Sequence, residues 1–123
     1  MLATSPIFRT VALTAFQRVA DRWNLDQNER ATLLAASSRS IRRWGKDVAA
    51  ADLNRDQMER ISYMLGIFAG LHAVLGETDL ADEWVRRPNL DFGDGPPLAR
   101  MLVGNVGDLA FVRSYVDQWV SNL

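Results

Sequence analysis

The densest group of cationic side chains in the sequence lies between positions 39 and 46. This segment contains Arg39, Arg42, Arg43 and Lys46, together with the hydroxyl group of Ser40. Guanidinium and ammonium groups bind phosphate oxygens through charge-assisted hydrogen bonds, and arginine also recognises the edge of guanine. The five residues are therefore candidate contacts to a nucleic acid. The alternative is that the same charges only solvate an ordinary surface helix.

Residues suited to catalysis are scarce. His72 is the only histidine and there is no cysteine, so the sequence offers no thiolate metal site, and no histidine other than His72 could activate a serine nucleophile in a triad. We expect His72, within an apolar helix, to be packed or at the rim of the core. Asp82 and Arg86 have the spacing of a solvated helix face. Gly93–Asp94–Gly95 lacks the preceding strand and the Lys-Ser/Thr ending of a phosphate loop. We predict no enzymatic activity, no catalytic residue, no metal and no cofactor.

The charge is unevenly distributed along the chain. The net charge of all 123 residues is −1, which taken alone would argue against nucleic acid. Residues 1–46 carry eight Arg or Lys and three carboxylates, whereas residues 47–123 carry six Arg and twelve carboxylates. Such asymmetry suggests that the basic half meets a polyanion, since phosphate neutralisation dominates non-specific DNA affinity. The acidic half is then free to bind something else.

The elements around the cationic segment predict a helix-turn-helix. Asp26 and Glu29 have the spacing of a capping box, which places a helix start at Asp26. The 35–38 segment breaks the apolar pattern, and Ser37 or Ser38 can cap a second helix. In that helix Ile41 and Trp44 would point inward and leave the cationic side chains outside. The turn lacks the glycine common in such units.

The remaining pattern predicts an all-α chain. We expect an N-terminal helix-turn-helix subdomain over residues 1–50, packed with a C-terminal helical subdomain over residues 51–123. Beyond the two helices above, the expected helices cover approximately 6–23, 53–75, 79–87, 98–103 and 106–119, with loops over 45–52 and 88–97. The first helix should bury a stripe made of Ile7, Val11, Phe16, Val19 and Trp23.

Two features of the 53–75 helix indicate how it starts and packs. Asn54 or Asp56 can cap it, and Asp56 with Glu59 again has the capping spacing. Gly66 and Gly70 form a small-xxx-small pair that allows a second helix to approach closely. We interpret this pair as a packing feature.

The last helix has more apolar surface than a terminal helix of a small domain needs. Leu109, Val112, Val116, Trp119 and Leu123 make one stripe, and Phe111 and Tyr115 widen it on one flank. Either another chain covers the excess surface, in a dimer or a different complex, or Phe111 and Tyr115 pack under the 88–97 loop.

Composition favours a soluble cytoplasmic protein. No apolar run approaches the roughly 20 residues needed to span a bilayer. The segment Met1–Phe8 has no basic region before an apolar core, so no secretory signal is expected. We therefore expect no membrane partner.

The order of motifs resembles the Xre/MbcA/ParS-type antitoxins. The segment from Asp21-Arg22-Trp23-Asn24-Leu25 to Trp44 resembles their N-terminal helix-turn-helix. The C-terminal half is similar to their toxin-binding domain in its long apolar helix from Arg60, followed by Trp84, Pro88-Asn89, Pro97-Leu98, Leu102 and Gly104. The segment 92–97 departs from the pattern as an insertion.

The resemblance implies a type II antitoxin that neutralises a co-encoded, NAD⁺-degrading RES-domain toxin by covering its active-site entrance. It also implies binding to operator DNA, repression of its own operon, and assembly as a homo-oligomer or a higher-order toxin–antitoxin complex. The implied toxin contacts lie in the C-terminal half: Trp84, Pro88, Asn89, Phe92, Phe111, Tyr115, Trp119 and Leu123.

Two other classes remain open at the level of sequence. One is a helix-turn-helix transcriptional regulator that homodimerises through its C-terminal half and has no toxin partner. The other is a structural adaptor without a DNA role, for which no salt-dependent DNA binding would be expected.

Overall fold

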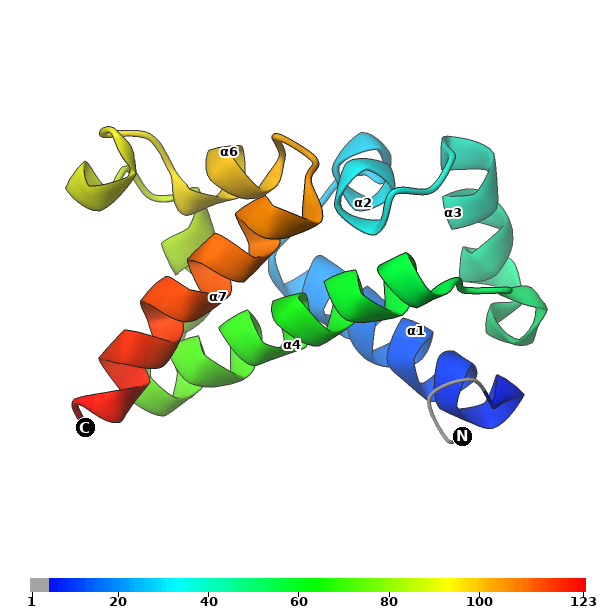
Figure 1. Cartoon of the computed structure of the whole chain (residues 1–123), viewed down its shortest axis with the longest axis horizontal. Coiled ribbons are helices and arrows are strands. Elements are labelled where there is room, and N and C mark those ends of the chain that lie inside the picture. The colour runs from blue at the N-terminus through cyan, green and yellow to red at the C-terminus, as the bar shows by residue number, and fades with distance from the viewer. Residues whose placement is uncertain (1–4) are drawn as a thin grey trace.

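The computed structural model describes residues 5–123, and over this range the fold is all-α (Figure 1). Residues 1–4, part of the segment considered for a secretory signal, lie outside the described residues. No strand occurs within 5–123; the β-type pairing described there is an isolated antiparallel bridge between Asn89 and Gly95. The α-helices are α1 (Pro6–Arg22), α2 (Gln27–Leu34), α3 (Ser38–Lys46), α4 (Arg55–Leu75), α5 (Asp79–Glu83), α6 (Pro97–Met101) and α7 (Val106–Ser121). Short 3₁₀ turns are η2 (Val48–Ala50), η3 (Trp84–Arg86) and η4 (Leu90–Phe92).

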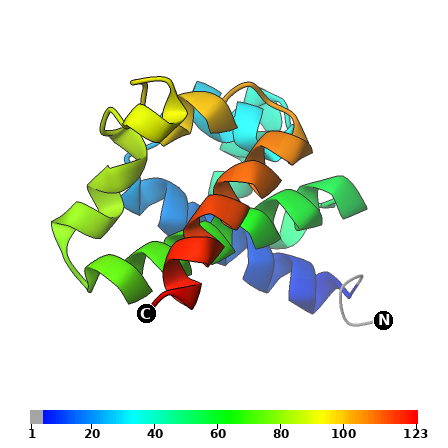
Figure 2. The same ribbon diagram turned by 60° about the vertical axis from the view of Figure 1, so that its left-hand side comes forward.

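Helix α4 is the central element, and both α1 and α7 pack along it (Figures 1 and 2). The predicted close approach at Gly66 and Gly70 is present. A Cβ added at Gly66 would meet the Arg113 guanidinium, and one at Gly70 would lie 2.5 Å from Cγ1 of Val116. Glycine at these positions therefore lets α7 lie directly on the backbone of α4.

The face that α1 buries is only partly the predicted one. Phe16, Val19 and Trp23 are buried, but Ile7 and Val11 are 78% and 62% exposed, so their predicted burial was wrong. The core-facing stripe instead continues through Ala12 and Leu13. Nothing in the described chain covers the N-terminal turns of α1 on the Ile7 side.

Local capping signals set most helix starts. Ser5 caps α1, and the predicted capping box of Asp26 and Glu29 starts α2. For α4 the box is formed by Asn54 and Gln57. The alternative spacing at Asp56 was therefore wrong, and Asp56 lies inside the first turn.

Several helix ends differ from the sequence expectation. Gly45 lies inside α3, which continues to Lys46. The predicted 79–87 helix stops being α-helical at Glu83 and continues as the 3₁₀ turn η3 before Pro88. Gly76, with φ +79°, ends α4 as predicted. The segment 88–97 is irregular as expected, apart from η4.

The segment α5–η3 is tied to the N-terminal half, so the interpretation of Asp82 and Arg86 as a solvated face was wrong. Arg86 donates to the carbonyl oxygens of Trp23 and Asn24, both at 2.8 Å, and pairs with Glu29 at 2.8 Å. Arg22 pairs with Asp82 at 2.8 Å. These contacts hold the end of α1 and the start of α2 against the C-terminal half.

His72 is packed, as expected, at the C-terminal end of α4. It is 8% exposed, and its ring lies 4.2 Å from that of Phe68. Its Nε2 lies 2.9 Å from Asp82 and its Nδ1 3.0 Å from Glu77. The geometry gives His72 a role in fastening α5 to α4. Within residues 5–123, no cluster of three or more His, Asp or Glu is suited to a metal ion. No helix of this range is long and apolar enough to cross a membrane.

Candidate DNA-binding and partner-binding surfaces

The unit formed by α2 and α3 has a tight turn without glycine. Ala35 occupies the left-handed region, with φ 51° and ψ 47°. A non-glycine residue there costs roughly 1–2 kcal/mol, so the surrounding structure must hold it. Gln57 of α4 does so by donating from Nε2 to the carbonyl oxygen of Ala35 at 3.3 Å. Helix α4 thus holds the turn in place, and with it the angle between α2 and α3.

Helix α3 is oriented by its cap and by two buried side chains. The Ser37 hydroxyl accepts from the backbone N–H of Ser40 at 3.0 Å, which makes Ser37 the cap. Ile41 and Trp44 are buried, as predicted from their spacing. The opposite face of α3 must then point into solvent.

The cationic side chains gather on that outer face. Arg39, Arg42, Arg43 and Lys46 are all exposed and together line one hollow of the surface. No ion pair within residues 5–123 involves any of the four, although nine other pairs occur there. The first turn of α3 carries no acidic residue. This face is therefore an uncompensated positive surface at a helix with a free outer side, suited to phosphate groups.

Ser40 is only half-exposed and differs from its cationic neighbours. Its Oγ accepts from the Ser37 hydroxyl at 3.1 Å, as part of the α3 cap. The hydroxyl group of Ser40 can still donate one hydrogen bond to a ligand. Its contribution would be positional, since it carries no charge.

A second surface is built around an aromatic cluster in the C-terminal half. Trp84 of η3 is its centre, 9% exposed, with ring centroids 6.0 Å from Phe92, 5.9 Å from Tyr115 and 6.2 Å from Trp119. Phe111 joins through Phe92, at 6.0 Å. The cluster brings together five of the eight predicted partner-binding residues, from three separate segments.

The 88–97 loop packs over the aromatic face of α7. Phe92 lies 5.0 Å from Tyr115, centroid to centroid, and the Tyr115 hydroxyl donates to Asp91 at 2.7 Å. This hydrogen bond to the carboxylate, followed by burial, raises the pKa of Tyr115 above its ordinary value of 10.0. Of the two alternatives for Phe111 and Tyr115, packing under the loop is thus present, but it leaves part of the surface uncovered.

The uncovered part includes Phe111, on the flank of the predicted stripe, and two residues of the stripe itself, Trp119 on α7 and Leu123 beyond its end. Phe111 is 44% exposed, Trp119 36% and Leu123 76%, so the buried stripe ends at Val116. The Arg100 guanidinium lies 4.0 Å from the centre of the Phe111 ring, on the rim of this surface. The buried Trp84 packs against the exposed Trp119 ring, whereas Phe111 is supported by Phe92.

Of the loop residues, Pro88 is exposed and Asn89 is half-buried. Asn89 shapes the loop: its Oδ1 accepts from the N–H of Asp91 at 2.9 Å. Sequence reasoning did not single out Leu90, which is 85% exposed at the start of η4. Its hydrophobicity gave no signal, because in the sequence it cannot be distinguished from a core leucine.

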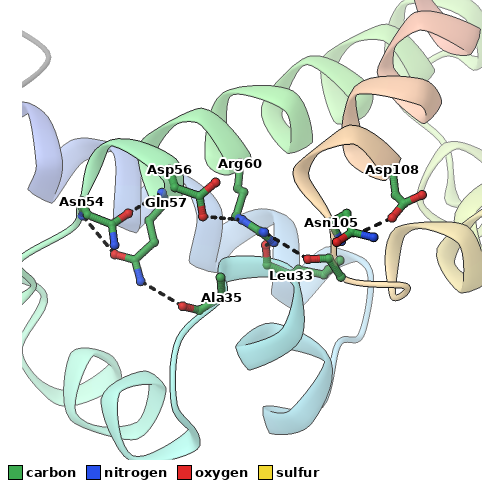
Figure 3. A network of polar contacts seen from close by, with 9 residues as sticks. Leu33, Ala35, Asn54, Asp56, Gln57, Arg60, Asn105 and Asp108 are labelled. Carbon is green, nitrogen blue, oxygen red and sulfur yellow. Dashed lines mark hydrogen bonds and ion pairs between the residues drawn. The ribbon is translucent and has the colours of Figure 1, made fainter.

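A buried arginine connects α2 of the helix-turn-helix to the segment before α7 (Figure 3). Arg60 of α4 is 7% exposed and pairs with Asp56 at 2.8 Å. Its Nη1 donates to the carbonyl oxygen of Leu33, in α2, at 3.3 Å, and its Nη2 to that of Gly104, before α7, at 3.0 Å. One guanidinium group thus bonds the end of the first helix of the helix-turn-helix to the start of the last helix.

The two surfaces lie at opposite ends of the molecule. In Figure 1, α3 lies at the right end of the long axis, and the loop around residue 90 at the left end. A ligand on α3 and a protein on the aromatic surface can therefore be bound at the same time. Fold and surfaces together are those of a helical helix-turn-helix protein with an uncompensated cationic face at one end and an exposed aromatic surface at the other.

Comparison with known families gives the particular class. The chain matches the antitoxin Xre-like helix-turn-helix domain over residues 4–66 and the antitoxin Xre/MbcA/ParS C-terminal toxin-binding domain over residues 70–120. The chain belongs to the Xre/MbcA/ParS family of antitoxins, proteins of type II toxin–antitoxin systems. It is also similar to the uncharacterized protein y4oB of Sinorhizobium fredii (strain NBRC 101917 / NGR234), with 42% identity over 107 residues that cover 85% of this chain and 81% of that protein.

Proposed function

We propose that this antitoxin neutralises a co-encoded RES-domain toxin that degrades NAD⁺, by laying α7 and the 88–97 loop over the entrance of the toxin's active site. The observation that supports the proposal most is the aromatic surface on α7, where Phe111, Trp119 and Leu123 stay exposed although the loop packs beside them. Aromatic side chains with a buried support are typical centres of protein interfaces.

The other end of the molecule would bind the operator and repress the operon. Arg39, Ser40, Arg42, Arg43 and Lys46 of α3 would contact the major groove and its phosphates. One helix-turn-helix makes few phosphate contacts, and paired half-sites lie about 34 Å apart or a multiple of this. A toxin–antitoxin assembly that holds two copies at this spacing would raise affinity through effective concentration, and so couple repression to the amount of toxin.

The toxin part is tested by expressing the chain, tagged, together with the reading frame beside its gene. The expected result is a stoichiometric complex with a product that consumes NAD⁺ when it is produced alone. A clean homodimer beside an inert neighbour would overturn the RES assignment.

Two substitutions then locate the toxin-binding surface. Tyr115→Ala and Trp119→Ala should reduce protection of the cells at unchanged helical content by circular dichroism. Ile7→Ala, an apolar side chain that is 78% exposed on α1 and belongs to neither proposed surface, is the control. Full protection by both aromatic variants would exclude α7 from the interface.

The DNA part is tested by the double variant Arg39→Ala/Arg43→Ala. Each lost phosphate contact makes the slope of log K against log salt less negative by about 0.9, so the slope of the double variant should be less steep by roughly 2. The single variants should lie between, and Arg87→Ala should match the wild type. Retention of both operator affinity and salt slope would show that α3 is not the DNA-binding helix.

A further inference from the structure

The most exposed large hydrophobic side chain that the structure describes is Leu90, at 85%. It belongs to the 88–97 loop, a segment that lies at the end of the molecule farthest from α3 (Figure 1). A bare leucine on a mobile loop would mean little, because single apolar residues on surfaces are common. The question is therefore whether this loop is held in one conformation.

Backbone hydrogen bonds close the loop at its base. The N–H of Asn89 donates to the carbonyl oxygen of Gly95 at 3.0 Å. The Asn89 carbonyl in turn accepts from the N–H groups of Phe92, at 2.9 Å, and Asp94, at 3.1 Å. Asn89 thus forms hydrogen bonds across the whole turn, both with its backbone groups and with its side chain.

The two residues that follow Leu90 are fastened to the body of the protein. Asp91 accepts from the Tyr115 hydroxyl, and the Phe92 ring packs against Trp84, Phe111 and Tyr115. With Asn89 fixed on one side and Asp91 on the other, Leu90 is presented outward in a defined position. A loop backbone ordered before binding loses less entropy on association.

The surroundings of Leu90 are acidic. Asp91 and Asp94 are exposed on the same loop, and no ion pair within residues 5–123 neutralises either. Asp94 also occupies the left-handed region, with φ +67°. The loop therefore presents one apolar side chain together with two exposed carboxylates, whose complement is an apolar pocket with a cationic rim.

We infer that Leu90 is the anchor residue of the antitoxin, inserted into an apolar, cation-rimmed pocket of the toxin. This inference rests on the proposed function, since it takes the toxin as the partner of this end of the molecule. It adds a contact that lies outside α7. In this arrangement the preformed loop inserts Leu90 into the toxin, and the aromatic surface forms the rest of the interface around it.

The test is the affinity of Leu90 variants for the immobilised product of the adjacent reading frame. Leu90→Ala should weaken Kd at least tenfold, mainly through faster dissociation. Leu90→Met keeps the volume and polarity and should stay within threefold of wild type. Ile7→Ala is the matched control, because Ile7 is 78% exposed at the opposite end of the chain and should change nothing. Thermal unfolding should be the same for all four proteins.

The outcomes separate the inference from the proposed function. If the wild type does not bind the product, the proposed function fails before Leu90 is tested. If the wild type binds and Leu90→Ala binds equally tightly, the anchor is refuted while the toxin interface stands.

The cationic rim is tested with Asp94→Asn, which keeps the shape and tolerates the left-handed backbone. At low salt this variant should associate several-fold more slowly than wild type, and the difference should vanish at high salt. Identical association at all salt concentrations would refute the charged part of the pocket.

Discussion

Replacing Arg60 by Met tests whether one guanidinium group holds the two halves of the protein together. Met keeps most of the apolar stem and removes the charge and all donors. Three contacts are lost: those to Asp56 and to the carbonyl oxygens of Leu33 and Gly104. Asp56 is about half exposed, with 49% of its side-chain surface accessible, so water can replace its partner.

The loss in the free energy of unfolding depends mainly on the two carbonyl groups that lose their donor. Leaving a buried acceptor unsatisfied costs about 1–3 kcal/mol. The Leu33 bond is buried, whereas the Gly104 bond is only partly buried and its acceptor can be rehydrated. We therefore expect a loss of about 3 kcal/mol in the free energy of unfolding. For a chain of this size, that is a fall in Tm of roughly 10 °C.

The assay is urea unfolding followed by far-ultraviolet circular dichroism, with Tm as a second measure. The midpoint should fall at an unchanged m value. Arg87→Ala, which breaks an exposed i,i+4 pair with Glu83, should change stability by less than about 0.5 kcal/mol. If Arg60→Met stays within about 1 kcal/mol of wild type, desolvation of the guanidinium cancels its bonds, and the proposed tie contributes nothing net.

Three further changes have defined outcomes. Gly70→Ala should destabilise by roughly 1–3 kcal/mol in urea unfolding, because its Cβ would lie 2.5 Å from Val116. Ala35→Gly should stabilise by up to about 1 kcal/mol by the same measure, since it relieves the left-handed strain in the turn. Asp91→Asn should lower the pKa of Tyr115 toward 10.0, seen in the ultraviolet titration of tyrosinate, because the carboxylate that raises it is gone. The raised pKa means that the stabilisation from this pair is complete below the ordinary pKa and is lost as pH rises through the folded value.

Each change has its own control. Gly45→Ala is the counterpart of Gly70→Ala, since a Cβ at Gly45 meets nothing within 4 Å; equal effects at both positions would contradict the contact with α7. A destabilised Ala35→Gly would show that the lost side chain matters more than the backbone. The titration is run on a Tyr63→Phe background, because Glu59 also raises the pKa of Tyr63. An unchanged Tyr115 titration would contradict the hydrogen bond to Asp91.

The local part of the fold could be predicted from the sequence because its signals are local. The capping box at Asp26 and the buried pair Ile41 and Trp44 depend only on helix geometry. The choice of buried face on α1 could not be predicted in the same way. Ile7 and Val11 fit a helical stripe, but where α4 crosses α1 decides which turns are covered, and that is a tertiary property.

The candidate surfaces show the same difference between what local sequence signals predict and what tertiary contacts decide. The cationic face of α3 follows from helical spacing, whereas Leu90 and the support of the turn by Gln57 arise from contacts between distant segments. Arg60 did carry a signal: it stands one turn before Met64 on the buried face of an apolar helix. Its partners are backbone carbonyls 27 and 44 positions away, and no side-chain pattern encodes them.

The type of atom that Arg60 binds has a consequence for how such antitoxins diversify. Both of its long-range acceptors are main-chain oxygens, which every amino acid provides. The residue at position 33 can therefore change without loss of the bond as long as the backbone path is kept, whereas position 104, with φ +102°, needs glycine to keep that path. A lineage can exchange the side chains of α7 and the 88–97 loop to follow a changing toxin, while the joint to the DNA-binding half is inherited unaltered. Chimeric antitoxins built with their junction after α4 should keep this joint, and those joined at residue 50 should depend on the incoming chain to supply both Gln57 and Arg60.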